Sequence, residues 1–223
     1  PKDKGRLPKI SKLDSNLSIK FDLYESNIEP YLRFTHKMNI KMASWVNIKY
    51  ITQDNEISRC QHSYICHYNN VSHVEKQDIS NLTLGAWDIE AFSYSTRYNG
   101  INEFPDPEKP KDIITQIGTS LYKFGSKEKV KHVVTIKSPI DKCCDPVDGI
   151  IIEEVDSEEE LIEKWVKFII KTDPDILVQY NGYDFDWKYV CARAKLLNVE
   201  YILENLSRIE SKPAHLHEDQ LNT

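Results

Sequence analysis

The sequence predicts an α/β domain over residues 81–223, preceded by a mostly β domain over residues 1–80. In the first 80 residues, short runs alternate apolar and polar residues, which is typical of half-buried strands. After residue 80, strand-like runs are followed by an amphipathic helix-like segment, a short apolar run and a second helix-like segment. Strands that alternate with crossover helices indicate an α/β fold.

Three strands are expected in the first domain, at residues 17–25, 31–35 and 44–51. The first shows the alternation best, because every second residue is apolar, namely Leu17, Ile19, Phe21 and Leu23. Residues 71–80 are polar and are expected to connect the two domains.

The second domain is expected to begin with strands at residues 82–92, 112–124 and 129–137. Residues 94–111 contain several turn-forming residues and predict an exposed loop between the first two strands.

An amphipathic helix is expected to follow Ser157. Ser157 and Glu160 form a capping box, and the acidic run at 153–160 is read as a solvated helix start. The dipeptide Asp173-Pro174 is expected to end the helix. A short buried strand at 176–178 and a second helix that starts near Asp186 complete the pattern.

The composition limits the function classes. The chain has 223 residues, a net charge of -6 and 40% hydrophobic residues, which disfavours both disorder and a general basic nucleic-acid coat. An acidic nuclease site neutralised by metal ions stays compatible with this charge. No signal peptide or membrane span is visible, and five cysteines indicate reduced thiols in the cytoplasm or nucleus. Because both ends lie in polar sequence, we expect a piece of a longer protein.

Two acidic residues stand out in the first strand of the second domain. Asp88 and Glu90 are two positions apart and are expected to share one face, with Ile89 turned into the core. Like charges side by side repel unless protons or cations intervene. Together with Asp186 they could form an all-oxygen site for Mg²⁺ or Mn²⁺, as in two-metal phosphodiester hydrolysis. The alternative is a strand end whose acids face water.

Three phrases in this order resemble the 3′-5′ exonuclease domain of family B DNA polymerases, with the closest likeness to the delta type and its relatives in large DNA viruses. They read WDIE, FPDPEKPKDIITQIG and DPDILVQYNGYDFDWKYVCARAK. The first exonuclease motif, D-x-E, matches Asp88 and Glu90, and the second, N-x3-F-D, matches Asn181, Phe185 and Asp186. The segment YLRFTHKMNIKMASWVNI is similar, more weakly, to the delta-type N-terminal domain.

The resemblance implies a ribonuclease-H-like exonuclease fold and proofreading. Asp88, Glu90 and Asp186 would hold two Mg²⁺ or Mn²⁺ ions, and Asn181 and Phe185 would seat the single-stranded 3′ primer end. The implied partners are DNA, the rest of the polymerase chain and a sliding clamp, in the nucleus or at a viral replication site in the cytoplasm. The family's third motif, Y-x3-D, has no match after Asp186. We therefore expect a truncated exonuclease domain that does not polymerise and hydrolyses DNA weakly.

Two other functions stay open: a stand-alone 3′-5′ exonuclease, and a non-catalytic fragment that keeps only the fold. A zinc site at Cys60, His62, Cys66 and His67 is disfavoured, because the spacing does not match usual zinc motifs. Three aromatic residues of the 94–111 loop either stack on bases or pack within the loop, namely Tyr94, Tyr98 and Phe104. His132 is expected at the surface of its strand.

Overall fold

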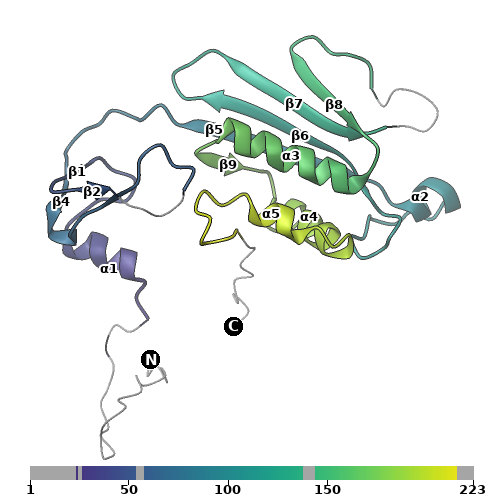
Figure 1. The fold of residues 1–223 in the computed structure, drawn as a ribbon. Helices are drawn as coiled ribbons and strands as arrows, with labels where there is room; N and C mark the ends of the chain where they lie inside the picture. The colour runs from purple at the N-terminus through teal and green to yellow at the C-terminus, as the bar shows by residue number, and fades with distance from the viewer. Residues whose placement is uncertain (1–23, 25–26, 54–57, 138–143, 215–223) are drawn as a thin grey trace, which may run out of the picture. The chain divides into compact units, whose positions relative to one another are not determined.

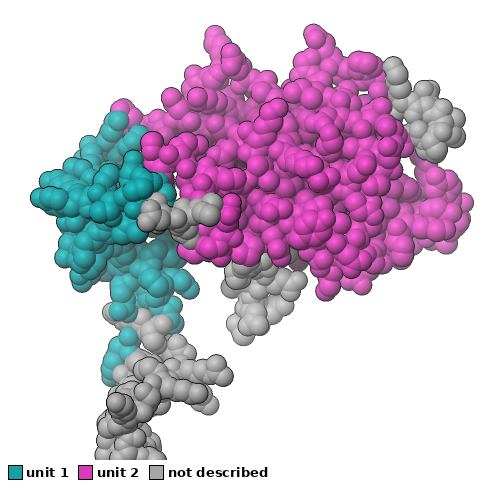
Figure 2. Space-filling model, viewed as in Figure 1, with its two compact units in different colours: residues 1–54, 63–77 teal, residues 55–62, 78–223 magenta. Residues whose placement is uncertain are grey.

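The computed structural model describes residue 24 and residues 27–53, 58–137 and 144–214. The chain divides into two compact units, shown in Figure 2. The first unit consists of Pro1–Asp54 and Ser63–Gln77, and the second of Asn55–His62 and Asp78–Thr223. Apart from Tyr24, the strand predicted at residues 17–25 lies outside the described residues.

In its described residues, the first unit contains one α-helix, one short 3₁₀ helix and two small antiparallel pairs of strands. Helix α1 covers Pro30–Lys37; β1 (Val46–Ile48) pairs with β4 (Val71–His73), β2 (Thr52–Gln53) pairs with β3 (Tyr64–Ile65), and a short 3₁₀ helix covers Tyr68–Asn70.

Two sequence predictions for this unit are wrong and one holds in part. The strand predicted at 31–35 is helical, because Pro30 occupies the first turn, where its fixed φ favours a helix, and His36 and Lys37 occupy the last turn, where cations are favoured. The expected connection at 71–80 begins with strand β4. The strand predicted at 44–51 is present over Val46–Ile48.

A five-stranded mixed sheet forms the centre of the second unit (Figure 1). Its strands are β5 (Thr83–Ala91), β6 (Ile114–Lys123), β7 (Lys129–Ile136), β8 (Ile150–Val155) and β9 (Ile176–Val178), in the spatial order β8-β7-β6-β5-β9. Strand β6 is antiparallel to both β5 and β7, whereas β8 is parallel to β7 and β9 is parallel to β5. The three strands predicted for this part are confirmed; β8 was not predicted.

Helix α3 (Glu158–Thr172) begins where the capping box predicted it. The Ser157 hydroxyl accepts a hydrogen bond from the Glu160 N–H at 3.2 Å. Asp173 ends the helix in the left-handed region, with φ of 44°. Three further helices are α4 (Asp186–Leu196), α5 (Glu200–Glu204) and the short α2 (Tyr94–Asn99), which lies inside the predicted loop.

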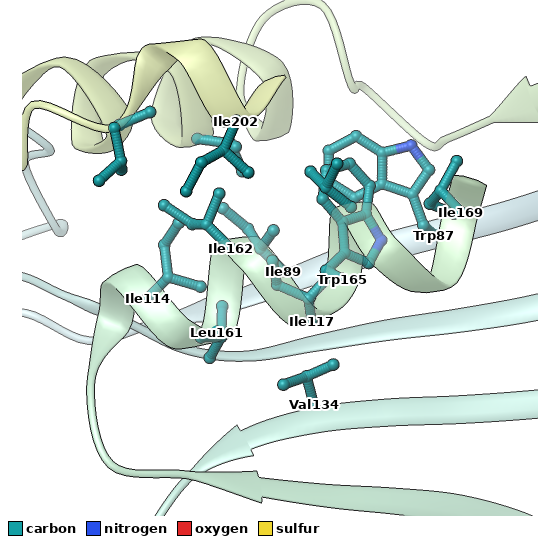
Figure 3. Close-up of a cluster of buried hydrophobic side chains, with 14 of the residues drawn as sticks. Trp87, Ile89, Ile114, Ile117, Val134, Leu161, Ile162, Trp165, Ile169 and Ile202 are labelled. Atoms are coloured by element: carbon teal, nitrogen blue, oxygen red, sulfur yellow. The ribbon is translucent and has the colours of Figure 1, made fainter. Parts of the chain in front are cut away.

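The core lies between α3 and one face of the sheet (Figure 3). Ile117 of β6 and Val134 of β7 face Leu161 of α3, and all three side chains are fully buried. The Trp87 ring of β5 contacts both Trp165 of α3, at 4.5 Å, and Trp187 of α4, at 4.7 Å. Helices α3 and α4 therefore share the face of the sheet to which Trp87 points.

Three predictions for the second unit need correction. The strand at 176–178 is present, but Ile176 and Val178 are 41% and 39% exposed because β9 is an edge strand. His132 is buried, since its ring stacks on Phe168 at 3.8 Å and its Nε2 lies 3.0 Å from Glu153. The acidic run is only partly a solvated helix start, because Glu153 lies in β8 and Glu158 is buried.

Candidate active site

Strand β5 places its two acids on the side of the sheet opposite the tryptophan cluster. Along this strand Trp87 and Ile89 are buried whereas Asp88 and Glu90 are exposed, as the period-two alternation predicted. Asp88 lies opposite Gly118 of β6, and the space beside Gly118 is open. Asp88, Gly118, Ser120 and Lys131 line a shallow groove of about 350 Å³ on this face.

Asp186 is the first residue of α4, and its side chain lies next to β5 although the two are almost a hundred residues apart in the sequence. Its side chain is buried, and one carboxyl oxygen accepts a hydrogen bond from the Ile89 N–H at 3.4 Å. Burial raises the pKa of Asp186 above its ordinary value, and the neighbouring Asp88 carboxyl raises this pKa further through a hydrogen bond and charge repulsion. The fold thus brings two of the three predicted carboxylates close enough together to interact.

Glu90 is two residues further along β5, next to a change of register between Glu90 and Ala91 in the pairing with β6. Such a bulge re-aims side chains and is common near functional sites. Among the residues that the structure describes, no group of three His, Cys, Asp or Glu side chains is close enough together to hold a metal ion. Glu90 as a third ligand therefore stays a prediction.

The turn between β9 and α4 carries the remaining predicted residues. Asn181 has a φ of 59°, and its carbonyl oxygen accepts hydrogen bonds from the N–H groups of Asp184 and Phe185, both at 3.1 Å. Asn tolerates this left-handed conformation better than most residues. A Cβ at Gly182 would overlap the side chain of Gln179, so any larger residue there would displace that side chain. The turn thereby delivers Asp186 to the start of α4.

Phe185 connects this turn to the loop that follows β5. Its ring meets Phe104 edge-to-face at 5.5 Å, and Phe104 is 74% exposed. Tyr94 instead packs against Tyr98 at 4.6 Å and under the Lys111 ammonium at 4.2 Å. Of the three aromatic candidates in the loop, Phe104 is the one in ring contact with the second motif.

Two buried charged residues near the site were missed in the sequence. Asp112 accepts hydrogen bonds from the N–H groups of Tyr94 and Asp106, at 2.8 and 3.1 Å, and Arg193 of α4 pairs with Glu158 of α3. The available signal was spacing: Arg193 follows Asp186 by seven residues, which places both on one helical face.

One histidine of the Cys/His segment has a local structural role. His67 Nδ1 accepts a hydrogen bond from the Asn69 N–H at 3.3 Å, capping the 3₁₀ helix. Cys60 and Cys66 are free thiols.

Comparison with known proteins decides the family. The sequence profile described as "DNA polymerase family B, exonuclease domain" matches residues 21–220. This chain belongs to that family. A DNA polymerase of Acanthamoeba polyphaga mimivirus is 31% identical over 183 residues, covering 80% of this chain and 10% of that protein. The DNA polymerase delta catalytic subunit of Oryza sativa is 30% identical over 190 residues, covering 82% of this chain and 16% of its own length.

A solved structure agrees with the fold of this exonuclease domain. The family B DNA polymerase of Pyrobaculum calidifontis superimposes with a TM-score of 0.53 at 21% identity, covering 79% of this chain and 18% of that chain. The exonuclease fold expected from the sequence is thereby confirmed. The chain spans less than a fifth of the length of either the mimivirus or the Oryza sativa DNA polymerase. No helix among the described residues has the length and apolar character that crossing a membrane requires.

Proposed function

We propose that this chain is the exonuclease part of a replicative family B DNA polymerase, and that it removes the last nucleotide of a frayed primer. The observation that carries the proposal is the position of the buried Asp186, whose carboxyl accepts a hydrogen bond from the N–H of Ile89, the residue after Asp88, and interacts with the Asp88 carboxyl. A protein gains nothing in stability from two abutting carboxyl groups, one of them buried, because each disfavours the charge of the other. Such pairs are typical of sites that bind cations or move protons.

The donor set fits Mg²⁺ or Mn²⁺. Carboxylate oxygens are the ligands that these hard cations prefer, and a divalent charge beside Asp88 and Asp186 would offset both their repulsion and the burial of Asp186. Asp88, Asp186 and, as a third ligand, Glu90 would hold the metal. When bound, the metal would activate water and stabilise the charge that develops on the phosphodiester.

The surrounding residues suit a single-stranded 3′ end of any sequence. The exposed ring of Phe104, braced by Phe185, offers a stacking surface, and the exposed Asn181 amide offers hydrogen bonds. Stacking accepts every base, because each base has a π-face. A mismatched end would enter more readily than a paired one, since it costs less to unpair.

The source of the substrate, a further partner and the cellular location are parts of the same proposal. The substrate would be the primer end, delivered by the rest of the polymerase chain. A sliding clamp as a further partner and a nuclear or viral replication site as the location stay predictions.

Hydrolysis of a 3′-labelled single strand tests this function in a longer chain that includes the family's third motif. Asp88→Asn with Glu90→Gln should lower the rate at least about 100-fold, because metal ligands are lost. The matched control is Asp148→Asn with Glu128→Gln, which removes two exposed acids and should keep the unmodified rate. Equal rates in the two double variants would overturn the site.

Mn²⁺ titration of the present chain distinguishes the alternative of a non-catalytic fold. Binding that is weakened by Asp88→Asn supports the metal site, whereas no binding at millimolar Mn²⁺ favours a fragment that retains only the fold.

A further inference from the structure

Arg193 uses its whole guanidinium group inside the protein. The residue is 1% exposed, and its Nε and Nη2 donate to the two carboxylate oxygens of Glu158 at 2.9 and 2.6 Å. Its remaining donors reach three backbone carbonyls of the loop before β6: Pro107 at 3.1 Å, Lys109 at 2.9 Å and Pro110 at 3.3 Å. Because a guanidinium has five N–H donors, none remains to bind a phosphate.

Glu158 completes this connection on the side of α3. It is 5% exposed, and its Oε1 also accepts a hydrogen bond from the Ile114 N–H, at 2.8 Å, where β6 begins. The two opposite charges cancel within the protein, with the bidentate geometry that favours Arg over Lys. The pair therefore joins α3, α4, β6 and the loop without adding net charge beside the carboxylates.

The same loop is fixed a second time at Asp112. Its carboxylate accepts hydrogen bonds from the Tyr94 and Asp106 N–H groups, and its carbonyl accepts one from the Tyr189 hydroxyl at 2.8 Å. Phe104 comes just before this anchored stretch, mostly exposed yet in ring contact with Phe185. Phe104 thus lies two residues before Asp106, whose N–H this anchor holds.

We propose that Arg193 is a positioning residue, which orders residues 103–112 so that Phe104 is held beside Phe185 and Asp186. This inference rests on the proposed function. A loop that is already ordered before substrate arrives avoids the entropy cost of ordering on binding. The role requires the planar fork of the arginine, not its charge alone.

Amide hydrogen exchange tests the ordering directly, without substrate. Arg193→Lys keeps the charge but cannot supply five donors, so amides of residues 103–112 should exchange at least about ten-fold faster while those of β6 keep their protection. Arg208→Lys is the matched control, because Arg208 pairs with Asp173 at 2.7 Å and donates to the carbonyls of Asp173 and Pro174 at the far end of α3. Unchanged exchange in the 103–112 loop, or equal acceleration in both variants, would overturn the proposal.

Single-strand binding tests the consequence, with a hydrolysis-resistant phosphorothioate oligothymidylate as the probe. Arg193→Lys and Phe104→Ala should each weaken binding about ten-fold, the effect of one lost base–aromatic contact. The double variant should bind no more weakly than Phe104→Ala alone, because both changes remove the same contact. Additive losses would show that Arg193 acts elsewhere and would overturn the proposal. Failure of the unmodified chain to bind would count against the proposed function, and the exchange measurement would then decide on Arg193.

Discussion

Asp186 carries a carboxyl group where ionisation is unfavourable. Burial and Asp88 both raise its pKa, while the hydrogen bond from the Ile89 N–H lowers it. The net direction is upward, so without a cation this part of the molecule takes up a proton more readily than an exposed aspartate. The carboxyl pair is therefore a local cost to the fold that a bound divalent cation would offset.

Asp186→Asn should remove this cost. The folded-state pKa of Asp186 is raised, so the folded protein binds this proton more tightly than the unfolded chain does. The protonated residue therefore favours folding fully below the ordinary Asp pKa near 3.8, and this contribution to stability is lost as pH rises through the raised pKa. In a chelator at pH 7 the variant should unfold at a higher temperature than the unmodified chain, and the difference should vanish in acid. Thermal unfolding against pH measures this; the control is Asp184→Asn, an exposed acid of the same turn. Parallel pH profiles for Asp186→Asn and the unmodified chain would contradict the prediction.

Helix α3 shows how local sequence and packing cooperate in one element. Ser157 caps it, three glutamates occupy its first turn, and its buried face carries Leu161, Ile162 and Trp165 into the core. Glu158 has two roles, because it lies in the first turn of the helix and its buried side chain also pairs with Arg193. The start of α3 therefore supports the loop beside the candidate site.

Ser157→Ala should lower the free energy of unfolding by about 1 kcal/mol, the usual contribution of an N-cap hydroxyl. Urea unfolding followed by tryptophan fluorescence reports it, because Trp165 lies within this helix. Ser157→Asp keeps a side-chain acceptor at the cap and should retain most of the stability. Equal losses in the two variants would show that the cap is not the cause.

Strand β9 and helix α1 mark where local patterns mislead. The apolar run at 176–178 reads as a buried strand, yet its position at the edge of the sheet leaves two side chains partly exposed. Residues 31–35 alternate like a strand, yet Pro30 starts a helix there. For β9 the position at the edge of the sheet decides the exposure, whereas for α1 the deciding residue, Pro30, is next to the segment in the sequence.

Each of the two units is built from two segments that are not contiguous in the sequence. Residues 55–62 belong with the second unit although the flanking segments belong with the first. Arg59 accounts for much of this, because its guanidinium donates to the carbonyls of Asn205 and Ser207 at 2.8 and 2.7 Å, and its N–H donates to the Arg208 carbonyl at 2.8 Å. Ser58 adds a β-bridge to Ile209. The exonuclease unit thus includes a segment from earlier in the chain, whose described residues 58–62 we call the strap.

Arg59→Ala should destabilise the second unit by about 1–2 kcal/mol, since charged hydrogen bonds to carbonyls are lost at a partly solvated position. Trp87, Trp165 and Trp187 all lie in that unit, so their fluorescence in a urea titration reports its unfolding. Lys41→Ala is the comparison: it breaks an exposed ion pair with Glu75 in the first unit and should change stability by less than about 0.5 kcal/mol. An Arg59 variant as stable as the Lys41 variant would exclude the strap as a source of stability.

Local patterns alone were enough for part of this molecule. The alternation around Asp88 and Glu90, the cap at Ser157 and the strands at β5, β6 and β7 follow from residues close in sequence, because periodicity and capping are local effects. The two exonuclease motifs likewise indicated the family that the comparisons confirm.

Contacts between residues far apart in sequence could be identified only in the folded structure. The order of the strands, the burial of Asp186 against Asp88, the pairing of Arg193 with Glu158 and the burial of His132 all join residues far apart in sequence. The free energy of a buried carboxyl or guanidinium depends on which groups surround it in space. No run of neighbouring residues encodes that environment, so the raised pKa of Asp186 and the hydrogen bonds of Arg193 became visible only in three dimensions.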